Sequence, residues 1–406
     1  MMRAKKWVLC SASLCFACSF AWAQQAAAPA TAQTKAEIAT LETLLPQIPD
    51  RAVVLYFLAQ DYAQIGDQQK ALALLKEAVA AGEGVNPADD ATLRSLRENP
   101  DFRALVAKAE QQYPAVHKAC TLFTLPEKDL IPEGLDFDAS KSVFYLSSLF
   151  RRKVVKIDAN GHSADFAPSG KEDLLPLCGL RVATEDHSLW AAGCEDSGQG
   201  ELYHFSADGK LLERFPATRG KHLFNDLVLR SASEIYLTDS LANLVYRFDR
   251  RTHVFSALSF PRPLYYPNGI AQSDDQSALY VADAFGVLRY DLKTHAAHEV
   301  SRGPLNTLAG FDGLYWYRGD LVGVQNGIGM PRIVQVGLSE DGLSVRRLSV
   351  LEYRSPHTIL PTTGAVKGSQ FYFMENTQID NLKDGKILDP GKLQPVRIAV
   401  VDLIEP

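Results

Sequence analysis

Four residues whose side chains can bind a hard cation recur in similar surroundings along the chain. They are Glu133, Asn225, Asn268 and Asp312, and each stands where a turn leads into a short apolar segment. Two carboxylates and two amides form an oxygen-rich set of the kind that Ca²⁺ binds, unlike a zinc site. If the four meet in space, the sequence predicts a divalent-metal site, with Ca²⁺ as the expected ion. The alternative is that each residue merely caps a turn through its own side chain.

Two histidines are candidates for proton transfer beside these residues. His222 lies three residues before Asn225, and His357 precedes the segment that begins near Thr362. An imidazole has an unperturbed pKa of about 6.5 and can exchange a proton near neutral pH. For each histidine, the alternative is a rim position with no role. The sequence contains no Gly-x-Ser-x-Gly elbow, phosphate loop or His-Glu-x-x-His motif.

An internal repeat supplies the elements that must position these side chains. Its unit is a small turn residue, an apolar strand, a polar turn and a second strand rich in aromatic residues. Copies begin at residues 132, 177, 224, 267, 311 and 362. A period in the forties with four strands per unit is typical of β-propeller blades. The sequence therefore predicts a six-bladed β-propeller over residues 116–406, closed by pairing residues 121–125 with the strand from Val396.

The first strand of each propeller blade lines the central channel, so the residues that open these strands converge on one face. The six predicted openers are Glu133, Cys178, Asn225, Asn268, Asp312 and Thr363. Four of them are the cation-binding candidates. We therefore expect the metal site at the mouth of the channel.

Cys178 opens blade two and has a candidate partner in Cys194. A hairpin turning near Asp186 would place residues whose numbers sum to 372 opposite each other, including these two cysteines. Directly opposed cysteines can reach bridging distance, and an oxidising compartment favours the bond. The prediction is a disulfide beside the channel mouth, and the alternative is two buried thiols. Cys120 is expected to be a buried apolar residue.

Residues 35–115 show helical rather than strand periodicity. Apolar and small residues recur at helical spacing on both sides of Gly66, at Leu55, Leu58, Ala59, Tyr62, Ala71, Leu75 and Ala78. This order resembles a tetratricopeptide repeat, although the Pro that usually follows the second helix is missing. A single repeat cannot bury its own faces, so the segment should dock on its neighbour or on flanking helices. The alternatives are a plain helical hairpin used for packing and a site for a protein partner.

Residues 118–406 resemble the gluconolactonase and senescence-marker-protein-30-like family. The matching motifs are Glu133-Gly134, Asn225-Asp226, Pro267 to Ala271 and Asp312-Gly313. The resemblance implies that the Glu, the two Asn and the Asp are metal ligands on blades one, three, four and five. It also implies that Asp312 accepts a proton from water during hydrolysis of a lactone or ester. Leu227 and Phe311 depart from the family pattern, which bears on substrate preference.

Two functions are therefore expected from the sequence. In the first, Ca²⁺ polarises the carbonyl of a small-molecule lactone or ester, and water attacks it. In the second, the propeller is a non-catalytic binding or scaffold protein, and the metal ties its blades together. Sensitivity of hydrolysis to a chelator would separate the two.

The N-terminus predicts export. Three basic residues precede an uncharged apolar stretch, and residues 21–23 fit a signal-peptidase site, so residues 1–23 are typical of a signal peptide. Residues 24–34 predict a disordered linker. We expect a periplasmic or secreted protein without a membrane span after signal removal; the alternative is a retained anchor or a lipoprotein.

Composition narrows the class of protein. Apolar residues make up 46% and charged residues 22% of the chain, which excludes a wholly disordered chain and a multi-span membrane protein. The net charge is −6. The predicted signal holds three of the 42 basic residues and no acidic residue, so its removal gives −9. No run of Lys or Arg occurs, so no nucleic-acid partner is expected.

Overall fold

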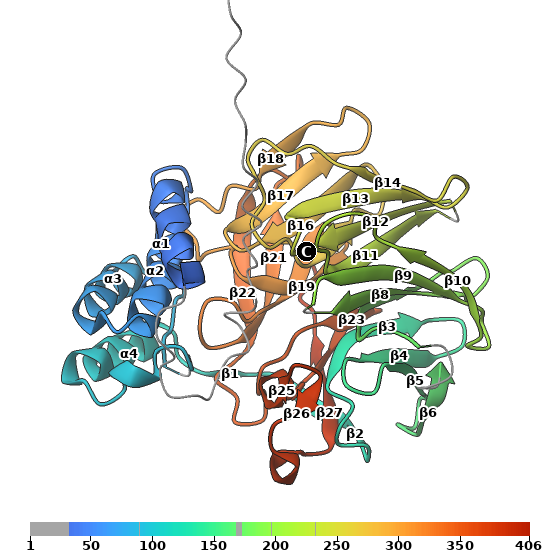
Figure 1. Ribbon diagram of the computed structural model, residues 1–406, viewed down its shortest axis with the longest axis horizontal. Coiled ribbons are helices and arrows are strands. Elements are labelled where there is room, and N and C mark those ends of the chain that lie inside the picture. The colour runs from blue at the N-terminus through green and yellow to red at the C-terminus, as the bar shows by residue number, and fades with distance from the viewer. Residues whose placement is uncertain (1–31, 89, 168–172, 196, 232) are drawn as a thin grey trace, which may run out of the picture.

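The computed structural model describes residues 32–88, 90–167, 173–195, 197–231 and 233–406. It shows a six-bladed β-propeller with a small helical module at its side (Figure 1), which confirms the predicted fold class. The predicted signal peptide and most of the predicted linker lie outside the described residues. In the described part of the chain, no helix combines the length and the apolar character that crossing a membrane requires.

The helical module contains four α-helices and a short 3₁₀ helix. They are α1 (Ala32–Leu44), α2 (Arg51–Gln64), α3 (Gln68–Ala80), η1 (Arg94–Leu96) and α4 (Pro100–Gln112). The helix α1 begins at Ala32, so the last three residues assigned to the linker are helical. Asp67 caps α3 by accepting a hydrogen bond from the Lys70 amide at 3.0 Å. Gly66, with φ of +87°, makes the tight turn between α2 and α3 that the sequence predicts.

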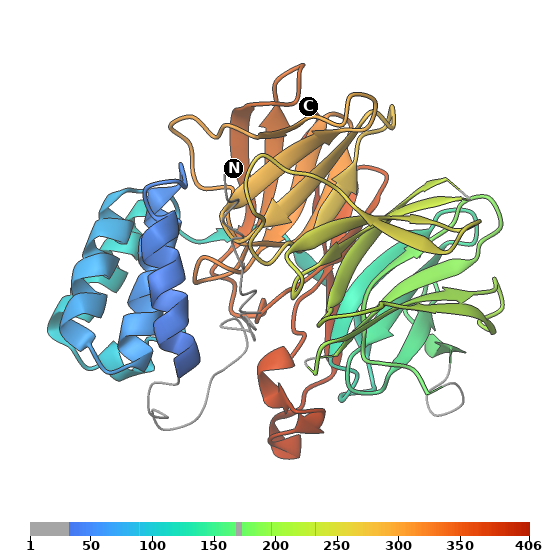
Figure 2. The same ribbon diagram turned by 45° about the horizontal axis from the view of Figure 1, so that its top comes forward.

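The module lies beside the propeller (Figure 2), and buried apolar side chains from both form one shared core. The ring of Phe57 on α2 lies 6.2 Å from that of Phe285, which stacks on Tyr265 at 4.9 Å. A polar contact adds to this interface. Asn86 of the helical module donates a hydrogen bond to the hydroxyl of Tyr353 on the propeller, at 2.7 Å. Docking of the helices on their neighbour is thus confirmed.

Asp61 makes the stability of this module depend on pH. Its side chain is buried on α2, and its Oδ2 has no hydrogen-bond partner among the described residues. Burial, and then the carboxylate of Glu37, raise the pKa of Asp61 from 3.8 to about 8. The folded state therefore binds more protons than the unfolded state between pH 4 and pH 8, and stability falls as the pH rises through this window.

We expect Asp61→Asn to remove most of this dependence, which is on the order of 3 kcal/mol. Thermal unfolding at pH 5 and pH 8 measures it: the wild type should lose several degrees more than Asp61→Asn on going to pH 8. Asp101→Asn, at an exposed position on α4, is the control and should behave as the wild type. An equal loss in wild type and Asp61→Asn would contradict the prediction.

The propeller consists of six antiparallel sheets. Blade one is β3 (Pro132–Asp138), β4 (Val143–Ser148), β5 (Lys153–Ile157) and β6 (Ser163–Ala167). Blade two is β7 (Leu177–Val182), β8 (Leu189–Glu195), β9 (Gln199–Phe205) and β10 (Leu211–Pro216). Blade three is β11 (Phe224–Ser231), β12 (Glu234–Asp239), β13 (Leu244–Asp249) and β14 (Val254–Ala257). Blade four is β15 (Ile270–Gln272), β16 (Ala278–Asp283), β17 (Gly286–Asp291) and β18 (Ala297–Glu299).

The last two blades each take a strand from the beginning of the domain. Blade five is β19 (Phe311–Tyr317), β20 (Asp320–Gln325), β21 (Arg332–Leu338) and β22 (Val345–Tyr353), with β1 (Val116–His117) at its edge. Blade six is β23 (Gly364–Lys367), β24 (Gln370–Met374), β27 (Val396–Asp402) and β2 (Cys120–Leu125). The pairing of β2 with β27 confirms the predicted ring closure.

Cys120 departs from its prediction. It lies on β2, the outermost strand of blade six, and is exposed rather than buried. The edge position explains this, because side chains on an outer strand have no further strand to cover them.

Candidate metal and substrate site

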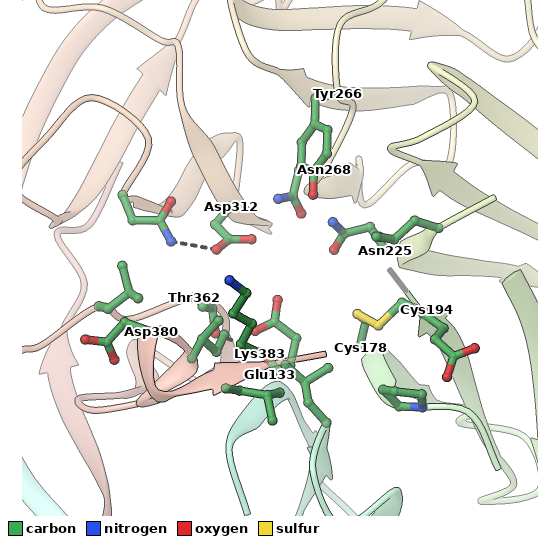
Figure 3. Close-up of a pocket in the computed structure, with 18 of the residues that line it drawn as sticks. Glu133, Cys178, Cys194, Asn225, Tyr266, Asn268, Asp312, Thr362, Asp380 and Lys383 are labelled. Carbon is green, nitrogen blue, oxygen red and sulfur yellow. Dashed lines mark hydrogen bonds between the residues drawn. A yellow bond between two sulfur atoms is a disulfide. The ribbon is translucent and has the colours of Figure 1, made fainter. Parts of the chain in front are cut away.

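The four predicted metal ligands line one pocket of about 600 Å³. Glu133 lies on β3, Asn225 on β11, Asn268 just before β15, and Asp312 on β19. Figure 3 shows their side chains converging on a common centre from four different blades. The structure thus brings these residues together.

A recurring β-bulge aims these side chains at the centre. In blades one, three and five, the pairing of the innermost strand shifts register directly after its first residue, where Glu133, Asn225 and Asp312 stand. Bulges redirect side chains and often occur beside functional sites. The residue that follows the first channel-facing residue of a blade is usually glycine, because the backbone of the next blade lies close to it. A Cβ on Gly134 would lie 2.4 Å from the Cys178 carbonyl oxygen, and a Cβ on Gly269 would lie 2.5 Å from the Asp312 carbonyl oxygen.

Three oxygens in this cluster are buried and have no hydrogen-bond partner among the described residues. They are Glu133 Oε2, Asn268 Oδ1 and Asp312 Oδ1. Buried polar atoms in folded proteins almost always have a partner, and a cation is a group that could pair with several acceptors in one pocket. Among the described residues, no three or more His, Cys, Asp or Glu side chains come together in a way that could hold a metal. The present cluster does not count as such a group, because two of its four side chains are amides. Such a set suits Ca²⁺ rather than zinc.

The amide of Asn225 is oriented by its neighbours. The Ser240 hydroxyl donates to the Pro267 carbonyl at 2.7 Å, so its oxygen can only accept from Asn225 Nδ2, 3.0 Å away. This assignment leaves Asn225 Oδ1 free of that contact and able to act as a ligand. In the same way, Asn326 Nδ2 donates to Asp312 Oδ2 at 2.6 Å and leaves Oδ1 for the pocket.

Burial and neighbouring carboxylates destabilise the charged forms of both acids. Burial, and then the nearby Asp312 carboxylate, raise the pKa of Glu133 well above 4.5. Burial also raises the pKa of Asp312, to about 7, although the side chains of Asn326 and Asn268 lower it in part. A cation between them would offset both burial and repulsion. The donor set, its burial and its charge therefore fit a divalent metal.

His222 and His357 do not line this pocket. His222 is buried, with Nδ1 2.6 Å from Asp239 Oδ2 and Nε2 2.8 Å from the Arg219 carbonyl oxygen. Both partners are acceptors, so the ring must donate from both nitrogens, and the hydrogen bond to Asp239 raises its pKa. A proton held in this way leaves no nitrogen free to act as a base. His357 is exposed, and its carbonyl oxygen accepts from Arg397 Nη2 at 3.0 Å.

Cys178 and Cys194 form a disulfide that lines the same pocket. The predicted register was wrong. Paired residue numbers were expected to sum to 372, but Arg181 pairs with Trp190 and Leu177 with Gly193, so the sums are 371 and 370. A bulge after Leu177 causes the second shift and places Cys178 off the direct pairing. The Cα atoms are nevertheless 6.0 Å apart, which is within the range for a disulfide.

A buried ionic cluster contacts the ligand-bearing strands and was not predicted. Arg181 Nη2 on β7 lies 3.1 Å from Asp226 Oδ2, and its guanidinium lies 5.3 Å from the centre of the Tyr315 ring. Burial alone would lower the pKa of Arg181, but the carboxylates of Asp226 and Asp136 raise it. Asp226 occupies the position where blades one, four and five have glycine. That difference within the repeat was the only signal in the sequence for this cluster.

Comparison with known proteins identifies no family for this chain. No protein-family model matches the chain, and no curated protein matches it. The chain is similar to virginiamycin B lyase from Staphylococcus aureus at 15% identity, covering 71% of this chain and 99% of that one, with a TM-score of 0.49. A gluconolactonase from Xanthomonas campestris matches at 15% identity, covering 72% and 94%, with a TM-score of 0.49. Likenesses of this size identify no activity, so the function must follow from the chemistry of the site.

Proposed function

We propose that this protein is a calcium-dependent hydrolase of a lactone or ester. The observation that carries the proposal is the set of buried, unpaired oxygens contributed by separate blades to one pocket. Glu133, Asn225, Asn268 and Asp312 would hold the ion. When bound, Ca²⁺ would supply a Lewis acid for the substrate carbonyl. We further propose that the protein is exported, as its N-terminus predicts.

The residues around the proposed ion would position the attacking water and hold the carboxylates in place. Asp312 Oδ1 faces the pocket and would accept a proton from the attacking water, while Asn326 holds the other carboxylate oxygen in place. The hydroxyl of Thr362 donates to the Glu133 carbonyl oxygen at 3.2 Å and so ties blade six to the strand that carries Glu133. A fixed carboxylate avoids the cost of reorganising the site during the reaction.

Removal of the metal tests the proposal. The mature protein, freed of metal with a chelator, should lose hydrolysis of aryl esters and lactones and regain it when Ca²⁺ is added. The bound-metal content of the same samples should follow the activity. Full activity in metal-free protein would contradict the proposal. A lower melting temperature after chelation, without hydrolysis of any substrate, would instead show a scaffold with a structural ion.

A further inference from the structure

Among the residues that the structure describes, blade six has the longest connection between its second and third strands. Between β24 and β27, residues 375–395 form η2 (Ile379–Asn381), β25 (Leu382–Lys383), β26 (Lys386–Ile387) and η3 (Pro390–Lys392). In blade four, by contrast, only residues 284–285 separate β16 from β17. Figures 1 and 2 show the insertion projecting from the body of the ring. We call residues 375–395 the blade-six insertion.

The blade-six insertion is held by hydrogen bonds within itself, to blade six and to the loop before blade one. Gln378 Nε2 donates to the Lys128 carbonyl oxygen at 3.1 Å and to that of Gln394 at 3.1 Å. Asn381 Nδ2 donates to the Asp389 carbonyl oxygen at 2.9 Å, and the Asp389 amide donates back to Asn381 Oδ1 at 2.9 Å. These bonds fix the two halves of the insertion to each other and to the loop before blade one. The insertion therefore presents a defined surface.

This surface forms an apolar part of the pocket that holds the candidate metal ligands. Ile379, Leu382 and Leu388 all line it, together with Leu149 and Phe150, which follow β4. The Leu388 side chain is 52% exposed, although it lines a pocket. A single exposed leucine needs no explanation, but a group of apolar side chains around one cavity marks a binding surface.

Some charged side chains that line the pocket are held in ion pairs, whereas Asp380, Lys383 and Asp384 line it from the insertion. Arg152 Nη2 pairs with Glu195 Oε1 at 3.3 Å, and Asp283 pairs with the Arg262 guanidinium. These two pairs occupy part of the hydrogen-bonding capacity of the lining. Asp380 and Asp384, also in the wall, are exposed residues of the insertion. The site thus combines a polar end at the four ligands with a wall in which apolar side chains lie beside charged ones.

We infer that the substrate carries an apolar acyl or alkyl arm, and that the blade-six insertion is the surface against which this arm lies. The inference rests on the proposed function for the reacting group, and it names the class of substrate: a hydrophobic lactone or ester rather than a polyhydroxylated sugar lactone. Burying each additional methylene should increase affinity by up to about four-fold until the pocket is filled.

A chain-length series tests the inference. Hydrolysis by the calcium-loaded mature protein is measured with γ-lactones from butyrolactone to decanolactone, and with an aldonolactone. We expect kcat/KM to rise along the series and to exceed that for the aldonolactone. Binding of the matching γ-lactams, which resist hydrolysis, is measured by calorimetry and should follow the same trend. Values that do not change with chain length, in both assays, would overturn the inference.

A matched pair of leucine variants locates the surface. Leu388→Ser should lower kcat/KM for decanolactone by about five-fold and leave butyrolactone unchanged. Leu212→Ser is the control, since Leu212 is 49% exposed on β10 and does not line the pocket. If Leu388→Ser changed kcat/KM equally for both lactones, or if Leu212→Ser had the same effect as Leu388→Ser, the insertion would not be the surface that binds the apolar arm.

The two assays separate this inference from the proposed function. Lactam binding that strengthens with chain length, without hydrolysis of any lactone or ester, would refute the hydrolase and support the apolar ligand. Hydrolysis that is lost on chelation but is indifferent to chain length would support the hydrolase and refute the apolar arm.

Discussion

Replacing Asp312 by Ala should weaken calcium binding by at least about 100-fold and lower kcat/KM by at least about 1,000-fold. The reason is that Asp312 supplies one of only two carboxylates in the cluster, and its Oδ1 has no partner among the described residues other than the ion that we propose. Calcium titration by calorimetry and initial rates of ester hydrolysis measure the two effects. Asp402→Ala, at an exposed position on β27, is the control and should match the wild type.

Asp312→Asn separates the two roles proposed for this residue. An amide keeps an oxygen for the metal but is a far weaker proton acceptor, so this variant should retain more calcium affinity than Asp312→Ala and still have a low kcat. The thermal shift provides a second readout. Chelation should lower the melting temperature of the wild type more than that of Asp312→Ala. Wild-type activity in Asp312→Ala would refute the proposed site.

Replacing Arg181 by Leu should destabilise the propeller by about 3–5 kcal/mol, because it leaves carboxylates buried without their counter-ion. The side chain of Asp226 is 2% exposed, and Arg181 is the cation that pairs with it among the described residues. Burial raises the pKa of Asp226, and Arg181 lowers it in part. Denaturant unfolding with calcium present and the disulfide intact measures the loss as a shift of the midpoint.

Arg318→Leu is the matched control for this experiment. The Arg318 and Glu405 side chains are 59% and 68% exposed, so their ion pair should contribute no more than about 1 kcal/mol. The double variant Arg181→Leu/Asp226→Asn should be less destabilised than the sum of the two single variants, because the unpaired charge is removed with its partner. A loss in Arg181→Leu as small as that in Arg318→Leu would show that the buried pair does not support the channel.

The repeat determined most of the architecture. Blade number, ring closure by residues 121–125 and the face shared by the blade openers all follow from alternating strands at regular spacing, because these are short-range patterns repeated along the chain. The four candidate ligands could be predicted for the same reason: each occupies an equivalent place in its repeat. The disulfide was also predicted, although by way of a register that the bulge after Leu177 displaces.

Only the tertiary structure decided what surrounds those ligands. The bulges that aim Glu133, Asn225 and Asp312 depend on pairing between strands, which local sequence does not encode. The engagement of both His222 nitrogens, by Asp239 and by the Arg219 carbonyl, also depends on how the chain folds back on itself. The blade-six insertion has no repeat to reveal its position, because it lies after the start of the last copy at residue 362. Contacts between distant segments arise when the ring closes, and for that reason the pocket, its charge pairing and its apolar wall could be read only from the folded chain.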